Sequence, residues 1–97
     1  MRIVFAPRAI RRLREIQSYI ALDNAGAAFR IAVRIRQTIE LLADHPKLGR
    51  DWDGRSRALL VSGLPYRVHY RIDEARQTVE IITIAHTSQL PPRLKQE

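Results

Sequence analysis

Three polar side chains at alternate positions, Arg67, His69 and Arg71, are the first candidates for chemistry. Alternate residues of a strand point to the same face, so a strand over residues 66–72 turns these three side chains outward together. A row of two guanidinium groups and an imidazole suits an anion such as phosphate or carboxylate. The same pattern is the polar face that any half-buried antiparallel sheet needs, and on pattern alone we favour that interpretation.

Further candidates lie on either side of this strand. An arginine-rich stretch with Arg50, Arg55 and Arg57 precedes it, and His86 stands at the end of the last predicted strand. A histidine there can act as a general acid or base near neutral pH, although such residues are more often surface groups or hydrogen-bonded corners. The full set predicted to bind a target or an anion is Arg50, Arg55, Arg67, His69, Arg71 and Gln89.

Motifs for metal or cofactor chemistry are missing from the sequence. The three histidines are too scattered for a metal site, and there is no cysteine. No glycine-rich phosphate loop, nucleophile elbow or HExxH motif occurs, so we expect neither a metal nor a cofactor. Trp52 is either a lid over the core of the predicted helix pair or a stacking platform for a base, and we predict the lid.

The chain has the length of one domain and a strongly basic composition. It holds 17 Lys and Arg against 10 Asp and Glu, a formal net charge of +7, and 45% of its 97 residues are hydrophobic. We predict a single domain over residues 1–97, with residues 90–97 as a short polar tail. The arginine excess favours nucleic acid or an acidic protein as partner, and a high-GC coding bias with ordinary solvated arginines is the alternative explanation. Without cysteines, a signal peptide or a membrane-length apolar run, we expect a cytoplasmic protein that does not enter the membrane.

The first half of the chain predicts a short strand and two helices. Residues 3–5 form a brief apolar run, and Pro7 suits the first turn of a helix. Asp23 and Asn24 give a turn and a cap before a second helix from Ala25 to about Asp44. The two apolar stripes are Ile10, Leu13, Ile16, Ile20 and Ala28, Ala32, Ile35, Ile39, Leu42.

The second half predicts a loop and three strands. Residues 45–56 are polar and glycine-containing, and strands follow over residues 57–62, 66–72 and 78–86. In the middle strand Tyr66, Val68, Tyr70 and Ile72 form the apolar face that packs on the helices. The expected fold is therefore α+β with the order β-α-α-β-β-β, a helical hairpin packed on one face of a small antiparallel sheet.

Several short segments, taken together and in order, are similar to a known family. They are Ala6–Ala9, Tyr19–Asn24 with Ala27–Ala28, His45–Arg50, Gly63–Ile72 and Ile84–Gln89. In order and spacing the chain resembles the RelE/ParE superfamily of bacterial type II toxins, and within it the ParE-like branch. The resemblance covers nearly the whole chain and is specific at the level of the superfamily. The predicted order of elements agrees with the fold of that family.

The resemblance implies a toxin that inhibits growth and is held inactive by a cognate antitoxin, in a heterodimer or a heterotetramer. In this family a partly helical antitoxin segment wraps the toxin and contacts the helix pair and the sheet, and the charge of +7 suits an acidic segment. DNA is then contacted only indirectly, through the antitoxin. We expect the antitoxin to contact Ile10, Leu13, Arg14, Arg30, Arg34 and Trp52.

The two branches of the family differ in target. RelE-like members cleave messenger RNA in the ribosomal A site, whereas ParE-like members act on DNA gyrase and cleave no RNA. If this chain is a nuclease, the resemblance assigns catalysis to Arg67, His86 and Arg57. However, Ala58 and Leu60 stand where RelE has two lysines, and no tyrosine follows His86.

We therefore favour a non-enzymatic gyrase poison. The alternatives are a ribosome-dependent endoribonuclease and a degenerate member that binds antitoxin without toxicity.

Overall fold

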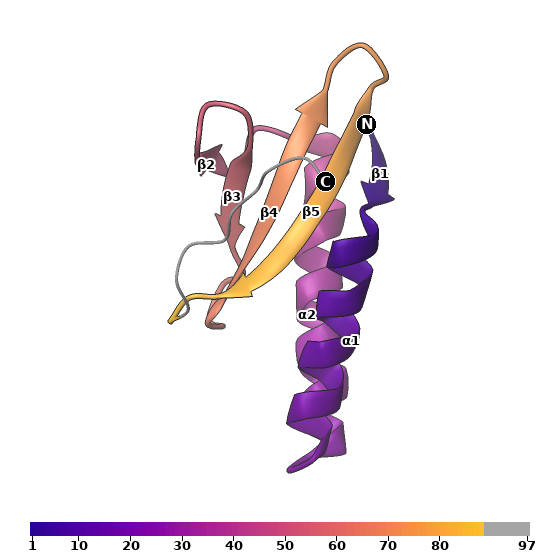
Figure 1. Ribbon diagram of the computed structural model, residues 1–97, viewed down its shortest axis with the longest axis vertical. Coiled ribbons are helices and arrows are strands. Elements are labelled where there is room, and N and C mark those ends of the chain that lie inside the picture. The colour runs from indigo at the N-terminus through magenta and orange to yellow at the C-terminus, as the bar shows by residue number, and fades with distance from the viewer. Residues whose placement is uncertain (89–97) are drawn as a thin grey trace.

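Within residues 1–88, which the computed structural model describes, a hairpin of two helices packs against one face of a five-stranded sheet (Figure 1). The predicted α+β class and the helical hairpin on one face are confirmed. The elements are β1 (Arg2–Phe5), α1 (Pro7–Ala21), α2 (Ala25–Asp44), β2 (Arg50–Asp51), β3 (Arg57–Leu60), β4 (Tyr66–Asp73) and β5 (Thr78–His86).

The two helices begin and end where local chemistry places their ends. Pro7 is the first residue of α1, and the side chain of Asn24 caps α2 by accepting a hydrogen bond from the backbone N–H of Ala27 at 2.9 Å. The predicted core stripe of α2 is confirmed at all five positions. In α1, however, Ile10 is exposed and Ala9 is buried in its place, so Ile10 does not belong to the core.

The sheet differs from the prediction in two details. Its strand order is β1-β5-β4-β3-β2, and β1 runs parallel to β5 while the other neighbours are antiparallel, so the sheet is mixed. A parallel pair needs a long crossover, and here the whole chain between Phe5 and Thr78 supplies it. Residues 45–56, predicted as loop, also contribute the short strand β2, in which Arg50 pairs with Ala58.

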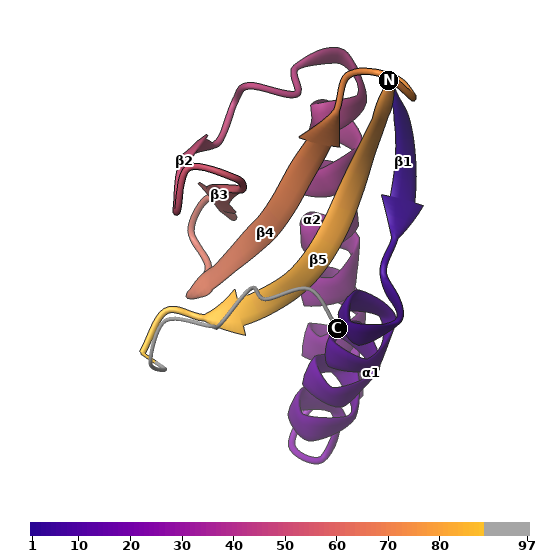
Figure 2. The same cartoon turned by 45° about the horizontal axis from the view of Figure 1, so that its top comes forward.

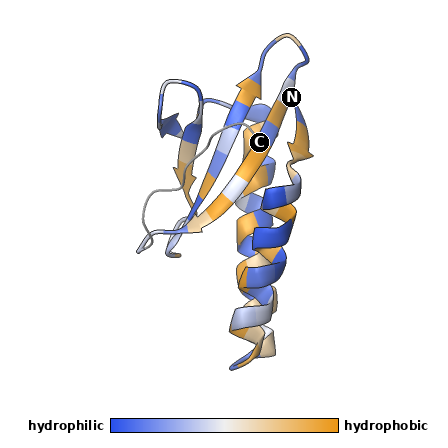
Figure 3. Cartoon of the chain, in the orientation of Figure 1, coloured by the Kyte–Doolittle hydropathy of each residue, from blue (hydrophilic) through white to orange (hydrophobic). Residues whose placement is uncertain are grey.

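The alternation of β4 determines which side chains meet the helices. Tyr66, Val68 and Tyr70 lie in the buried core with both helices, and Ile72 packs against its margin, as predicted. Figure 3 shows hydrophilic and hydrophobic bands alternating along this strand. The residues between them, Arg67 among them, therefore lie on the opposite face, which is called the outer face below.

A register shift interrupts the pairing of β4 with β5. His69 pairs with Thr83, whereas the next residue, Tyr70, pairs with Ile81. Ile82 is thus the extra residue of a β-bulge on β5. The bulge shifts the alternation of β5 by one residue, so that Ile81 and Ile84, which are three positions apart, both face the core.

The hydroxyl of Tyr70 fixes the segment that joins α2 to the sheet. It donates a hydrogen bond to the carbonyl of Pro46 at 2.6 Å and accepts one from the N–H of Gly49 at 2.8 Å. Burial raises the pKa of Tyr70, which keeps the donating proton in place. The Arg57 guanidinium also donates to the Gly49 carbonyl at 2.7 Å. A Cβ atom at Gly49 would lie 2.8 Å from the carbonyl oxygen of Ala58, so only glycine fits this close approach.

The hairpin is longer than the sheet, and its tip projects past the strands (Figure 2). The Nε atom of Arg12 links α1 to β5 by donating to the carbonyl of Ile84 at 3.2 Å. Near the tip three large apolar side chains remain exposed: Tyr19 at 75%, Leu22 at 82% and Phe29 at 68%. Within residues 1–88, neither helix has both the length and the apolar character needed to cross a membrane.

Replacing Tyr70 by Phe should lower the free energy of unfolding by about 3 kcal/mol, because it leaves the Gly49 N–H and the Pro46 carbonyl without their partner. Chemical denaturation measures this loss. Tyr66→Phe is the matched control, since the Tyr66 hydroxyl makes no hydrogen bond among the described residues, and we expect it to cost less than about 1 kcal/mol. Equal losses in the two variants would contradict the role of Tyr70.

Candidate functional site

The outer face of the sheet carries Arg67 and His69 side by side on β4. Each side chain faces short or apolar neighbours on the adjoining strands, namely Leu60 and Ala85 beside Arg67, and Ala58 and Thr83 beside His69. The structure therefore places these two predicted site residues together and on the predicted side of the sheet.

His69 is not presented outward, and that part of the prediction is wrong. Its side chain is 0% exposed, and its ring lies edge-on to the Trp52 ring at 4.7 Å between centroids. Neither ring nitrogen has a hydrogen-bond partner among the residues that the structure describes. Burial lowers the pKa of His69 to about 4, helped by the charges of Arg67 and Arg8 and opposed by Asp53. At neutral pH His69 is uncharged and adds no cation to an anion-binding face.

The arginines of the outer face are also less available than the sequence predicts. Arg71 forms an ion pair with Glu80, which lies directly opposite it on β5. Arg67 is half-buried and holds its guanidinium carbon 5.1 Å from the centre of the Trp52 ring. Within residues 1–88, Arg67, His69 and Arg71 share this face but are not presented together as exposed side chains. Arg50 and Arg55 are exposed arginines in and beside the Trp52 loop.

Trp52 lies on the outer face, against His69 and Arg67, so the predicted lid over the helix pair is wrong. Its loop is held by its own polar groups. The N–H of Trp52 donates to the Ser56 carbonyl at 2.9 Å, and the Asp53 carboxylate accepts from Ser56 and from the backbone of Arg55. These bonds, led by that from Arg55, lower the pKa of Asp53. The sequence does not predict this placement because it depends on how the loop folds back over β3 and β4.

The three residues that a nuclease would use do not lie together. Arg57 pairs with Tyr70 and His86 pairs with Tyr66, and directly paired residues share a face of the sheet. Arg57 and His86 are therefore on the helix side, about four residues or 13 Å apart along β4. Arg67 is on the outer face. A sheet thus separates the candidate phosphate-binding arginine from the candidate acid or base.

His86 lies in a corner formed by its neighbours. Its ring meets the Tyr66 ring edge-on, with 5.4 Å between centroids. The backbone N–H of Ser88 donates to Nδ1 at 3.1 Å, and the Ser88 hydroxyl lies 2.7 Å from the same nitrogen. Because Nδ1 accepts, the neutral ring carries its proton on Nε2. Gln89 and the polar tail at 90–97 lie outside the described residues.

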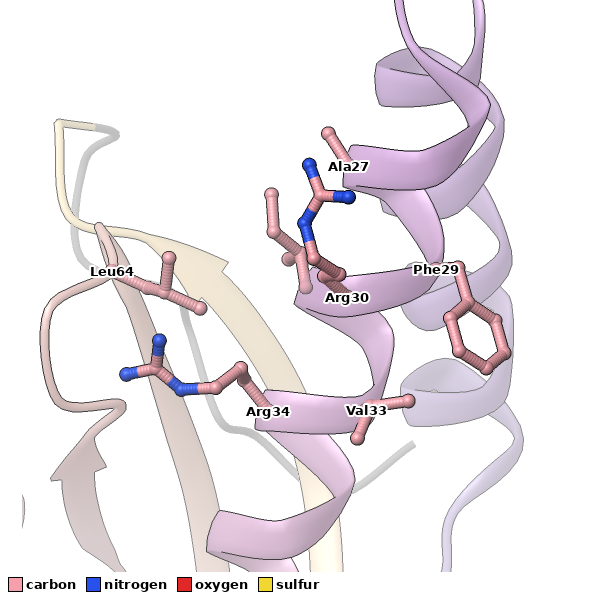
Figure 4. A pocket seen from close by; sticks show the side chains of 7 residues that line it. Ala27, Phe29, Arg30, Val33, Arg34 and Leu64 are labelled. Carbon is pink, nitrogen blue, oxygen red and sulfur yellow. The ribbon is translucent and has the colours of Figure 1, made fainter.

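A groove between α2 and the turn that joins β3 to β4 has a volume of about 460 Å³. Figure 4 shows Ala27, Arg30 and Arg34 of α2 on the side that faces Leu64 of the turn. The groove is mostly apolar at its base, with Ile31 also lining it, and the two arginines stand one helical turn apart at its edge.

Of the six predicted antitoxin-binding residues, Trp52 lies on the outer face against His69 and Arg67, and the other five divide into three groups. Arg30 and Arg34 come together at the groove, while Ile10 and Arg14 are exposed on α1. Leu13 is buried in the core and offers a partner no surface, so its prediction as a contact is wrong.

Leu64 and Phe29 also line the groove, and Tyr19 and Leu22 are exposed apolar side chains of the hairpin, but none of them was predicted from the sequence as a contact. In the sequence, Tyr19, Leu22 and Phe29 lie outside the apolar stripes of the two helices. This departure from amphipathic spacing is the feature that could have predicted their exposure.

Two features of the site define its class. Most of the predicted partner-binding side chains lie on exposed surfaces or along an open groove, and among residues 1–88 no group of three His, Cys, Asp or Glu side chains could hold a metal ion. Large surfaces with arginine, aromatic and exposed apolar side chains are typical of a protein that binds macromolecular partners.

Comparison with known proteins gives the family. A family model described as the ParE toxin of the type II toxin–antitoxin system parDE matches residues 3–91. The chain is 39% identical over 94 residues to "Putative toxin Y4kP" of Sinorhizobium fredii, covering 96% of this chain and 95% of that protein. It is 32% identical over 88 residues to "Toxin RelE2" of Caulobacter vibrioides, covering 91% and 97%. The chain belongs to the ParE family of toxins from toxin–antitoxin systems, and such a system implies an antitoxin partner.

A solved structure shares the fold. The chromosomal ParDE toxin–antitoxin system from P. aeruginosa superposes with a TM-score of 0.78 at 18% sequence identity, over 91% of this chain and 97% of that chain. The family-model match and the two relatives confirm the predicted resemblance to the RelE/ParE superfamily.

His69 makes stability depend on pH. Its pKa is about 4 in the folded chain and about 6.5 when unfolded, so the unfolded chain binds the extra proton between these values. The contribution of uncharged His69 to the free energy of unfolding should be fully present above pH 6.5. It should fall as the pH drops toward 4, by as much as about 3 kcal/mol. Denaturant unfolding at a series of pH values measures the slope. His69→Leu is the control that should lose this component, and parallel profiles for both proteins would contradict the burial of an uncharged His69.

Proposed function

We propose that this chain is a cytoplasmic toxin that inhibits growth by poisoning DNA gyrase, and that an acidic antitoxin neutralises it. In this proposal the chain catalyses no reaction and acts by binding. The observation that carries the proposal is the separation of Arg67 from His86 and Arg57 by the sheet. The match to ParE over residues 3–91 supports gyrase as the target, because the ParE-like resemblance implies it.

The chemistry of RNA cleavage explains why this separation matters. Attack of the 2′-hydroxyl needs a base, a positive charge on the phosphate and an acid for the 5′-oxygen, all within hydrogen-bond reach of one phosphate. Arg67 lies on the outer face, and His86 lies on the other face against Tyr66. The Arg67 and His86 side chains therefore do not contact the same phosphate group. The Arg57 guanidinium is bonded to the Gly49 carbonyl.

The groove on α2 supports the antitoxin part of the proposal. Its apolar base suits the apolar face of an amphipathic helix, and Arg30 and Arg34 at its edge suit acidic residues on that helix. Phe29 also lines the groove and is 68% exposed, so it adds apolar surface there. A segment with one apolar and one acidic face would cover both features.

Expression of the chain without antitoxin tests the proposal in cells. We expect induction of a DNA-damage reporter and filamentous cells, with no messenger RNA ends at ribosomal A sites. Arg67→Ala and His86→Ala should retain growth inhibition, with Arg76→Ala, at the exposed β4–β5 turn, as a surface control.

Removing a general acid or base from a nuclease costs about 10²- to 10⁴-fold in rate. A-site cleavage that disappears in either variant would contradict the proposal and support the endoribonuclease. If every folded form leaves growth unchanged, the proposal fails and the chain is a degenerate, antitoxin-binding member.

A further inference from the structure

Arg34 connects the groove to the turn between β3 and β4. Its guanidinium donates a hydrogen bond to the carbonyl of Ser62, at the start of that turn, and Figure 4 shows its side chain reaching from α2 toward the turn beside Leu64. Arg30 lies one helical turn earlier on the same side of α2 and makes no hydrogen bond among the described residues. The two arginines therefore differ, because one is bonded to the sheet layer.

The turn is anchored on its inner side, because Val61 is buried in the core and Leu64 packs against it, and its exposed apex is held by few hydrogen bonds. The N–H of Val61 donates to the Tyr66 carbonyl at 2.9 Å, and the N–H of Leu64 donates to the Val61 carbonyl at 3.0 Å. Gly63 has φ +76°, which suits glycine at the turn's apex. Ser62 and Pro65 are exposed, so the bond from Arg34 is a link that attaches this turn to α2.

The same turn holds the residues that follow β5. The N–H of Thr87 donates to the carbonyl of Pro65 at 2.9 Å, and the next residue, Ser88, bonds to the His86 ring. The groove and the end of β5 are thus joined through one turn, by the bond from Arg34 to Ser62 and the bond from Thr87 to Pro65.

We propose that Arg34 is the carboxylate-binding residue of the groove and that taking a partner's carboxylate releases the turn from α2. A carboxylate is a stronger acceptor for a guanidinium than a neutral carbonyl, and it binds bidentately. An acidic helix in the groove therefore competes with the Ser62 carbonyl for Arg34. Release of the turn loosens the bond between Pro65 and Thr87 and so changes the end of β5. This inference rests on the proposed antitoxin, and it assigns that partner a regulatory effect beyond covering a surface.

Arg30→Glu tests the inference without a partner, in the full-length free toxin. The introduced carboxylate and Arg34 would be spaced i, i+4 with the acid toward the N-terminus, the favourable order for an ion pair on a helix. This variant supplies the carboxylate within the chain. Arg30→Gln is the matched control, because it removes the same charge without adding a carboxylate. Arg34→Gln removes the bond to Ser62 directly.

Amide hydrogen exchange at Leu64 and Thr87, followed by NMR, is the measurement. We expect about fivefold faster exchange at both amides in Arg30→Glu and in Arg34→Gln, and no change in Arg30→Gln. In the double variant carrying Arg30→Glu and Arg34→Gln, exchange should equal that of Arg34→Gln alone.

Unchanged exchange at Leu64 in Arg34→Gln would overturn the proposed link between α2 and the turn. Faster exchange at Leu64 with unchanged Thr87 would overturn the connection to β5. Global unfolding is excluded by exchange at Val68 in the core of β4, which should stay slow in all variants. Neither gyrase nor antitoxin takes part, so this result is independent of whether the chain poisons gyrase.

Discussion

The packing of β4 beneath the helical hairpin is the constraint on which the rest of the structure depends. Tyr66, Val68 and Tyr70 enter the core, so their neighbours Arg67 and His69 must lie on the opposite face. The cross-strand pairs then assign Arg57 and His86 to the helix side. The two-residue period of the strands thus determines which of the candidate catalytic residues lie on the same face of the sheet.

The same strand also organises the outer face through Tyr70. Its hydroxyl fixes the segment after α2, and that segment leads into β2 and the loop that lays Trp52 over His69. The result is a packed aromatic and guanidinium cluster in place of a row of free cations. Exposed basic side chains are found on both helices and in the Trp52 loop, and two of them, Arg30 and Arg34, line the edge of the groove.

The sequence predicts the elements whose periodicity is local. The bounds of α2, its buried stripe, the residues of β5 and the apolar face of β4 all follow from spacing and capping signals. Pairing between distant segments does not follow from spacing. The parallel pairing of β1, the bulge at Ile82 and the burial of His69 each depend on contacts made only after the chain has folded. For the site, the structure places the predicted antitoxin contacts Arg30 and Arg34 together at the groove, whereas it buries Leu13 in the core and lays Trp52 on the outer face.

The central claim is that this chain acts by binding gyrase and not by cutting RNA, and purified components test it most directly. The toxin is incubated with gyrase, ATP and supercoiled plasmid, and in parallel with ribosomes programmed with a defined messenger RNA. The account predicts linear plasmid after the gyrase is denatured, with the messenger RNA intact. Messenger RNA cut at the A-site codon, with the plasmid unbroken, would contradict it.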